Sequence, residues 1–359
     1  MSNNTSKSSG VDIDLGNRCS KNAYAISKST FKNRQGRPGM PVMDVDGLFS
    51  SMIDFNGTKI GISSDGIGTK VELAERTGIY NTLGFDLLAM VADDLAAGGF
   101  VPTNISNIID ADFLDYDIID SLMNGLKAAC DFASVAISGG EIAELGNRMN
   151  GYGERMHFNW CSTAIGILHE SLKAPLDGKA LSEGDVVISL KSRGFRSNGF
   201  SLLRKILSEK FGDKWHNEKF GEATYGEAVL TPSLIYSPVV CEFMDNDIRV
   251  NGVVHVTGGG VADNLGRILR DEKFGAVLDN LFDPHEIMTH IQQLGKVSDE
   301  YAYRYWNMGN GMFVVVNPND ADKALQLAGK KGYQSRTAGV INRSGRITIP
   351  AKNLDYPIE

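Results

Sequence analysis

Apolar positions along this chain follow two periods, and each period predicts one kind of element. A helix is predicted over residues 83–97, where one stripe is apolar: Leu87, Leu88, Val91 and Leu95. Further helices are predicted over residues 117–133, 200–211, 232–244, 261–269 and 321–330, with Pro232 in the first turn of its helix. Short apolar or alternating runs predict strands over residues 60–63, 103–109, 135–138, 161–168, 186–190, 253–256, 312–316 and 337–341.

Strands and helices alternate in both halves of the chain, which predicts two α/β domains. We assign residues 46–172 to an N-terminal domain and residues 173–350 to a C-terminal domain that completes a cleft. Residues 1–45 are polar and interrupted by glycine and proline, so we expect a mobile N-terminal arm there.

The composition is that of a globular protein: 359 residues, 42% apolar and 22% charged. A net charge of −8 without a basic run argues against a nucleic-acid partner, although local basic groups leave a small anionic substrate open. No apolar stretch approaches the roughly 20 residues that span a bilayer, and no signal-like core is present, so neither membrane nor secretion is expected. Four widely separated cysteines fit a reducing cytoplasm.

A glycine-rich turn follows the strand at 60–63, and its residue types suit a nucleotide and a metal ion. Gly66 and Gly68 let backbone N–H groups approach an anion closely. Asp65 can hold a divalent cation, and Lys70 can offset phosphate charge. The same pattern also suits a plain hairpin turn, so the segment alone leaves both interpretations open.

Asp94 is a second candidate ligand for a cation. It lies beside the apolar stripe of the helix at 83–97, where an unpaired carboxylate is costly. A metal ion or a lysine partner would offset that cost, whereas a carboxylate at the helix edge could simply reach solvent. We favour the metal ion, because Asp65 offers a second hard oxygen ligand.

Two glycines end the predicted strand at 135–138 and are followed by Glu141 and Glu144. At helical spacing these two carboxylates share a face, where they can ligate a cation or contact ribose hydroxyls. The alternative is the first turn of a helix, in which acidic side chains favour the helix dipole.

Two turns in the second half each join a strand to a helix. In the first, backbone N–H groups with Ser197 and Asn198 can cradle a phosphate, and Arg196 adds positive charge; a capping loop is the alternative. The second turn starts at His255, which can donate to a phosphate or transfer a proton. A lone histidine beside an apolar strand is more often structural.

Six segments together match one family in content and order. They are Asp65–Lys70, Asp93–Leu95, Gly139–Glu144, Ser197–Ser201, His255–Gly260 and Trp306–Met312. The family patterns are D-G-[VI]-G-T-K, N-D-L at a helix end, G-G-E-T-A-E, S-N-G-[YF]-S, H-[IV]-T-G-G-G and F-N-M-G-x-G-M. The chain therefore resembles aminoimidazole ribonucleotide synthetase, also called phosphoribosylformylglycinamidine cyclo-ligase, from the segment Gly10–Asp14 onward to the region of residue 345.

The resemblance implies an ATP-dependent enzyme of purine biosynthesis. In that family ATP phosphorylates the formamide oxygen of formylglycinamidine ribonucleotide, the amidine nitrogen attacks, and the imidazole ring closes as phosphate leaves. The resemblance also implies a homodimer whose N-terminal domains join their sheets into a barrel, with the C-terminal α/β domains outside. Mg²⁺ is expected with ATP, and the sequence does not decide whether K⁺ is needed.

The family motifs also assign expected roles to individual residues. Catalytic roles fall on Asp65, Asp94, Lys70 and His255, and Mg²⁺ falls on Asp65 and Asp94. Contacts with ATP are expected from Gly66, Gly68, Thr69, Lys70, Gly139, Gly140 and Glu141. Contacts with the nucleotide substrate are expected from Arg196, Ser197, Asn198, Gly199, Thr257, Gly258, Gly259 and Gly260.

The chain departs from the family pattern at several positions near the expected cleft. Arg196 stands in place of the histidine before S-N-G, and Ile142 in place of the threonine of G-G-E-T. Asn107 replaces an aspartate, Leu234 replaces a basic residue, and the N-terminal flap at 39–47 has lost its usual glycine-rich sequence. These changes concern ATP closure and substrate contacts rather than the fold.

Two alternative functions share the architecture that the resemblance implies. Other ATP-using enzymes of the same fold include thiamine monophosphate kinase, selenophosphate synthetase and a hydrogenase-maturation protein. The N-terminal cysteine motif of selenophosphate chemistry and the C-terminal cysteine of hydrogenase maturation are not found in the sequence. The second alternative is a degenerate homologue that binds nucleotide without turnover, which the changes at Arg196 and Ile142 motivate.

Overall fold

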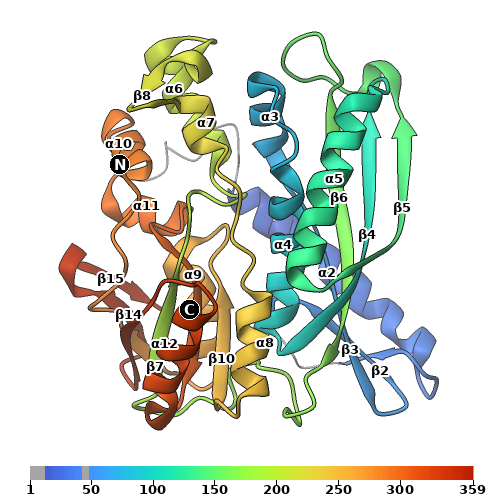
Figure 1. Cartoon of the computed structure of the whole chain (residues 1–359). Coiled ribbons are helices and arrows are strands. Elements are labelled where there is room, and N and C mark those ends of the chain that lie inside the picture. The colour runs from blue at the N-terminus through green and yellow to red at the C-terminus, as the bar shows by residue number, and fades with distance from the viewer. Residues whose placement is uncertain (1–12, 43–47, 359) are drawn as a thin grey trace.

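The computed structural model describes residues 13–42 and 48–358, which form two main sheets with helices around them (Figure 1). In the N-terminal sheet the strand order is β1-β2-β3-β6-β4-β5; β4 and β5 are parallel and the other neighbours antiparallel. Its strands are β1 (Met40–Pro41), β2 (Ser51–Phe55), β3 (Thr58–Gly66), β4 (Phe100–Ala111), β5 (Ala136–Glu144) and β6 (Phe158–Leu168). The helices of this half are α2 (Ile13–Thr30), α3 (Val71–Thr77), α4 (Leu83–Ala97) and α5 (Tyr116–Ala133).

Alternation along β6 shows which face of the N-terminal sheet the helices cover. Trp160 and Ala164 are fully buried on the face that α4 contacts. Ile165 and Ile167 lie on the opposite face and are 40% and 49% exposed. The sheet therefore has one face packed on the core and one face with exposed apolar side chains.

The C-terminal sheet has the strand order β10-β12-β7-β13-β11-β14-β15, and a small hairpin of β8 and β9 lies apart from it. The strands are β7 (Val186–Lys191), β8 (Lys219–Phe220), β9 (Ala223–Thr224), β10 (Val250–His255), β11 (Gly275–Val277), β12 (Asn310–Val316), β13 (Ser335–Asn342), β14 (Arg346–Ile349) and β15 (Leu354–Pro357). The helices are α6 (Phe200–Phe211), α7 (Tyr225–Val229), α8 (Ser237–Asp245), α9 (Gly260–Leu269), α10 (Glu286–Leu294), α11 (Asp299–Tyr305) and α12 (Ala321–Lys330).

Strand β7 is buried on both faces, in contrast to β6. Ile188 and Leu190 belong to a core cluster that includes apolar residues of α8 and α12. Val187, which points to the other face, belongs to the cluster that includes apolar residues of α9. A continuous apolar run such as 186–190 is expected of a strand covered on both sides.

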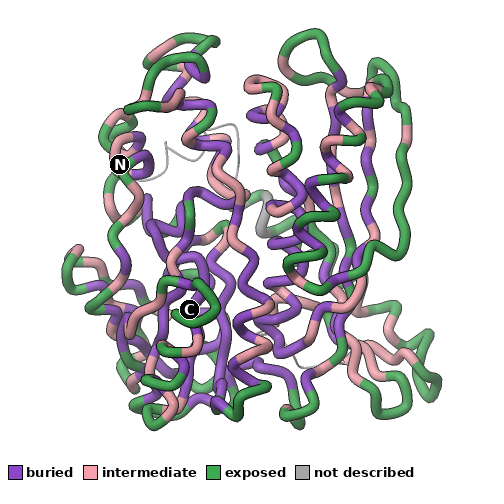
Figure 2. The backbone as a smooth tube through the Cα atoms, viewed as in Figure 1, coloured by how far each residue is buried: buried purple, intermediate pink, exposed green. Residues whose placement is uncertain are grey.

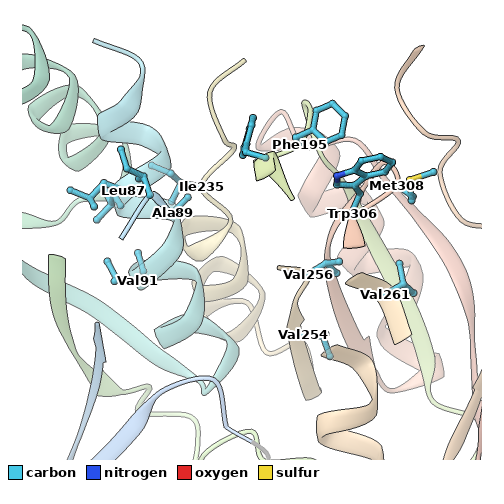
Figure 3. Close-up of a cluster of buried hydrophobic side chains, with 14 of the residues drawn as sticks. Leu87, Ala89, Val91, Phe195, Ile235, Val254, Val256, Val261, Trp306 and Met308 are labelled. Carbon is cyan, nitrogen blue, oxygen red and sulfur yellow. The ribbon is translucent and has the colours of Figure 1, made fainter. Parts of the chain in front are cut away.

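Helix α4 lies between the two halves of the molecule (Figure 1) and is buried along almost its whole length (Figure 2). It contacts β3, β4 and β6 on one side and α8 and β10 on the other. Figure 3 shows Leu87, Ala89 and Val91 on this helix, with Ile235 of the C-terminal half beside them. Its buried aspartates are paired with cations, so a helix that carries these polar residues can still be buried in this way.

Most predicted elements are confirmed. The helices predicted over residues 83–97, 200–211 and 321–330 are α4, α6 and α12, with the same bounds. Each predicted strand overlaps an observed strand, and the mixed α/β architecture with two sheets is confirmed. Within the described ranges no helix combines the length and the apolar character needed to cross a membrane.

The helix predicted over residues 232–244 is wrong in its first turn. Residues 231–236 are not helical, and α8 begins at Ser237 with Pro238 in its first turn. The backbone N–H of Tyr236 donates to Asp93 of α4 at 2.7 Å, and that of Ser233 to Asp86 at 3.0 Å. These carboxylates hold the segment in a conformation that an isolated sequence does not reveal.

The predicted end of the strand at Ser138 is also wrong. Strand β5 continues through both glycines, and Ala111 of β4 pairs with Glu144 at its end. Because side chains alternate along a strand, Glu141 and Glu144 point to opposite faces and share neither a helix nor a face.

The N-terminal arm contains regular structure that the sequence analysis missed. Residues 13–30 form α2, and β1 pairs with β2 at the edge of the sheet. Whether the arm moves stays a prediction. Most of the segment Gly10–Asp14 and the part of the flap at 43–47 lie outside the described residues.

Candidate active site

Asp65, at the end of β3, and Asp94, on α4, lie close enough for the charge of Asp94 to raise the pKa of Asp65. Burial raises the pKa of Asp94 to about 7. Desolvation raises the pKa of Asp65 to about 6, the backbone N–H of Gly66 opposes this shift, and the Asp94 charge adds to it. Ser63 Oγ lies 3.3 Å from Asp94 Oδ2 and donates to it. Two carboxylates that are costly to ionise together suit a site that binds a cation.

His255, at the end of β10, contacts Asp94 from the C-terminal domain. Its Nδ1 lies 2.7 Å from Asp94 Oδ1, and its Nε2 lies 2.7 Å from Nη2 of Arg196. Burial and the Arg196 charge lower the pKa of His255 to about 3, so the ring is neutral. Both ring nitrogens are engaged and the side chain is 0% exposed, which leaves no nitrogen for the phosphate contact or proton transfer that the sequence predicted.

Arg196 is placed differently from the sequence prediction. Its side chain is 1% exposed, and its Nη2 donates to Asp93 Oδ2 at 2.9 Å. Asp93 Oδ1 accepts from the backbone N–H groups of Tyr236 and Ser237 at 2.7 and 2.8 Å. The guanidinium therefore pairs with a buried carboxylate, and the predicted contact with the substrate phosphate is not supported.

Lys70 is buried in the same way. Its Nζ donates to Asp86 Oδ1 at 2.8 Å and to the carbonyl oxygen of Thr231 at 2.9 Å, and both charged side chains are 0% exposed. The predicted contact between this ammonium and a phosphate is therefore not supported either. Gly68 and Thr69, just before it, are exposed and remain candidates for such a contact.

A cavity of about 300 Å³ opens beside Asp65 on the N-terminal sheet. It is lined by Ser64, Asp65, Gly66, Ser106, Ile108, Cys161, Ser162 and Thr163. The lining residues of β4 and β6 were not predicted from the sequence. The available signal was the run of small polar residues on strands that the fold places next to β3.

Glu141 lies near this cavity, since it pairs in register with Ile108 of its lining. Gly139 and Gly140 precede it on β5, and all three residues are exposed. Asp65 aligns through the neighbouring strands with Gly140, so the side chains of Asp65 and Glu141 lie on opposite faces of the sheet, and the structure does not bring these two carboxylates together.

The two predicted turns of the C-terminal domain lie side by side. A Cβ atom added to Gly258 would lie 3.2 Å from Asn198 Oδ1, and the Asn198 amide reaches Met90 Sδ of α4 at 3.9 Å. Gly199 and Gly259 stand just before the first turns of α6 and α9. The N-termini of two helices therefore face one region, which suits an anion.

Aromatic side chains pack against the first of these turns, which precedes α6. Phe195 packs edge to face on Trp306, with ring centroids 5.4 Å apart, and Figure 3 shows both side chains beside Met308. Gly199 has φ +76°, and a Cβ atom there would lie 2.4 Å from the Trp306 ring. Ser197 Oγ is buried and, among the described residues, has no hydrogen-bond partner.

Arg267 on α9 is a residue that the sequence analysis did not single out. Its charge lowers the pKa of Asp94, against the larger effect of burial, and its guanidinium lies 4.6 Å from the Phe49 ring centroid. Its place one to two turns into the helix that follows Gly258–Gly260 was the signal that could have identified it.

Comparisons with known proteins match both halves of the chain to one family. Residues 50–168 match the N-terminal domain of AIR synthase related proteins, and residues 182–352 match the C-terminal domain. The chain is 33% identical over 94% of its length to a phosphoribosylformylglycinamidine cyclo-ligase of Thermococcus kodakarensis, of which it covers 95%. It is 31% identical to the chloroplastic cyclo-ligase of Arabidopsis thaliana, over 94% of this chain and 82% of that protein.

The fold is shared with a more distant protein of known structure. Thiamine-monophosphate kinase from Stenotrophomonas maltophilia superposes with a TM-score of 0.62 at 14% identity, covering 91% of this chain and 96% of that one. That identity is too low to indicate more than the fold. The similarity over nearly the whole length of the cyclo-ligases, together with both matched domains, shows that the chain belongs to the phosphoribosylformylglycinamidine cyclo-ligase family of AIR synthase related proteins.

Proposed function

We propose that this chain catalyses the ATP-dependent ring closure of formylglycinamidine ribonucleotide to aminoimidazole ribonucleotide, with release of ADP and phosphate. The observation that carries the proposal is the similarity to cyclo-ligases over almost the whole chain. The meeting of Asp65, Asp94 and the two glycine turns around α4 supports it, because each comes from a segment of the family motif.

Asp65 and Asp94 are the residues that would hold Mg²⁺. Both are hard oxygen donors, and the raised pKa of each means that the pair favours a nearby positive charge. Among the described residues no group of three or more metal-ligating side chains occurs, so phosphate oxygens and water would complete the coordination. When bound, Mg²⁺ would neutralise charge on the triphosphate.

The substrate's own phosphate would lie at the paired N-termini of α6 and α9. The N-terminal ends of both helices and the buried Ser197 hydroxyl, which has no partner among the described residues, are suited to phosphate oxygens. Fixing that end of a flexible substrate would hold the amidine nitrogen near the activated formamide carbon, which lowers the entropic cost of ring closure.

The direct test is an assay with formylglycinamidine ribonucleotide, ATP and Mg²⁺ that measures ADP and the imidazole product separately. Equal amounts of both are expected. ATP binding without turnover would support a degenerate homologue instead, and phosphorylation of thiamine monophosphate would support a kinase of the same fold.

Asp94→Asn is expected to abolish turnover, because the amide carries no charge for the metal. The fold should stay intact, since an amide at this position can still form hydrogen bonds with His255 and Ser63. Circular dichroism and turnover are measured together. Asp131→Asn, at an exposed position on α5, is the matched control and should retain activity. Normal turnover of Asp94→Asn would remove this residue from the metal site.

We also propose that the chain is a homodimer that buries the uncovered face of the N-terminal sheet. Exposed isoleucines gather there, including Ile108, Ile165 and Ile167 at 48%, 40% and 49% exposure. Ile108 also lines the cavity beside Asp65, so a partner on this face would help to enclose it. An apolar sheet face of this kind is typical of an interface.

A further inference from the structure

Arg196 adopts a conformation that is uncommon for a residue with a side chain. Its φ is +61°, in the left-handed region that favours glycine. Such a conformation persists only where the surroundings hold it, and it often marks a functional constraint. It is also the position where the family motif carries histidine and this chain carries arginine.

The guanidinium of Arg196 is held by defined partners around it. Nη1 donates to the carbonyl oxygen of Leu234 at 2.9 Å. Nη2 has two hydrogens, one for Asp93 Oδ2 at 2.9 Å and one for His255 Nε2 at 2.7 Å. The cation also stacks on the Tyr236 ring, 4.8 Å from its centroid.

These contacts determine which nitrogen of His255 carries the hydrogen. Arginine only donates, so Nε2 must accept, and the hydrogen of the neutral ring lies on Nδ1. Nδ1 is 2.7 Å from Asp94 Oδ1, where that hydrogen is donated. The opposite tautomer would set two N–H groups against each other, and its nearest carboxylate oxygen, Asp93 Oδ2, is 4.0 Å away.

We propose that Arg196 is a positioning residue for Asp94 and acts through His255. By occupying Nε2, it keeps a hydrogen on Nδ1, and that hydrogen fixes Oδ1 of Asp94 while Ser63 fixes Oδ2. Partners of this kind orient a metal ligand without contacting the metal. The consequence for metal binding rests on the proposed function, in which Asp94 holds Mg²⁺. The tautomer of His255 follows from the hydrogen bonds alone and does not rest on that function.

The tautomer is tested first, by ¹H–¹⁵N correlation of the imidazole rings in protein labelled with ¹⁵N-histidine. The chain has six histidines, and the loss of signals in His255→Gln identifies those of His255. A Nδ1–H ring is expected in the unsubstituted protein. A Nε2–H ring would overturn the proposal, whether or not the chain is a cyclo-ligase.

The role of Arg196 is tested with Arg196→Met combined with Asp93→Asn, so that no carboxylate is left buried without its cation. Circular dichroism checks that this variant is folded. A measurable share of the Nε2–H tautomer of His255, beside the Nδ1–H form that Asp94 still favours, is the expected result, together with weaker binding of Mn²⁺ in the presence of a non-hydrolysable ATP analogue. A loss of about tenfold in affinity is typical for such outer partners of a ligand. An unchanged tautomer with unchanged Mn²⁺ affinity would overturn the proposal.

A matched pair of substitutions at His255 separates positioning from general destabilisation. The side-chain amide of asparagine can donate from nearly the position of Nδ1, whereas that of glutamine reaches the position of Nε2. His255→Asn should therefore retain more Mn²⁺ affinity than His255→Gln. In the His255→Asn background, Arg196→Met with Asp93→Asn should cost no further affinity, since an amide has no tautomer to select.

An equal loss from both His255 variants would contradict the positioning role. If the unsubstituted protein binds no Mn²⁺ with the analogue, the proposed function is wrong. The tautomer of His255 then still tests whether Arg196 orients His255 and Asp94.

Discussion

At the scale of single residues, two buried cations are each paired with a carboxylate of α4. Lys70 pairs with Asp86, and Arg196 pairs with Asp93. Both cations were predicted to contact phosphate because glycine-rich turns with a basic residue commonly bind anions. The direction of a side chain depends on its tertiary partners, and the residues that pair with Arg196 lie 59 and 103 positions away. That information is not present in the local pattern.

Replacing Lys70 distinguishes a structural role from a phosphate contact. Lys70→Met leaves Asp86 charged and buried without its cation, so a loss of about 3–5 kcal/mol in the free energy of unfolding is expected from urea denaturation. Adding Asp86→Asn should restore most of it, since the amide oxygen can still accept from Ser233. Weaker ATP binding with little change in the free energy of unfolding would instead indicate that Lys70 contacts the nucleotide.

Glu75 on α3 gives a prediction of pH dependence away from the proposed metal site. Its side chain is 3% exposed and accepts the backbone N–H of Tyr152 at 2.8 Å. Burial raises the pKa of Glu75 above its ordinary value of 4.5, opposed by the Tyr152 hydrogen bond and by His157. The folded state therefore holds this proton to a higher pH than the unfolded chain does, and stability is lost as the pH rises through that window.

Glu75→Gln removes the titrating proton and retains an oxygen for Tyr152. Relative to the unsubstituted protein, the variant should gain stability on going from pH 4.5 to pH 8, as measured by urea denaturation at each pH. Glu72→Gln, whose carboxylate is partly exposed and paired with Arg76, is the control. Parallel curves for Glu75→Gln and the unsubstituted protein would show that the buried carboxyl does not cause the decline.

At the scale of elements, the success of the sequence analysis followed the strength of local signals. The bounds of α4, α6 and α12 were predictable because apolar periodicity and the flanking residues agree. The first turn of α8 was not, because carboxylates of α4 capture the backbone N–H groups that would otherwise begin a helix earlier. β5 was cut short because Gly139 and Gly140 signal a turn, and only pairing with β4 keeps them extended.

Close packing of α4 on α5 depends on two glycines, which gives an element-scale prediction. A Cβ atom on Gly84 would lie 2.1 Å from the backbone nitrogen of Leu126, and one on Gly125 would lie 2.1 Å from the carbonyl oxygen of Asn81. Gly84→Ala and Gly125→Ala should each destabilise the protein by about 1–3 kcal/mol or more, because backbone atoms must move apart.

Gly329 in α12 is the matched control for these substitutions. A Cβ atom there meets nothing within 4 Å, so Gly329→Ala should raise the free energy of unfolding by about 0.5–1 kcal/mol through helix propensity. If all three alanine variants changed stability in the same direction, helix propensity rather than interhelical distance would govern α4 and α5.

At the scale of the whole molecule, the site is assembled from segments far apart in the chain. Asp94 and His255 are 161 positions apart and touch only because α4 packs against the end of β10. The family motifs located these segments without their geometry. They predict Asp65, Asp94 and the glycine turns at one candidate site, but they do not show that Lys70, Arg196 and His255 are buried, or that the charge of Arg267 acts on Asp94.

The proposed dimer is the last property that belongs to the whole molecule. Ile165→Glu places a charge on the uncovered face of the N-terminal sheet, where it would be buried without a partner if two copies pack there. We expect sedimentation to show a dimer for the unsubstituted protein and a monomer, or at least tenfold weaker association, for the variant, since 1.4 kcal/mol already changes an equilibrium tenfold. Phe132→Glu on α5 introduces the same charge at a site of similar exposure, 51% against 40%, and should leave the dimer intact. Equal disruption of the dimer by both substitutions would show that the interface does not lie on this face of the sheet. A monomeric unsubstituted protein would show that no second copy encloses the cavity beside Asp65.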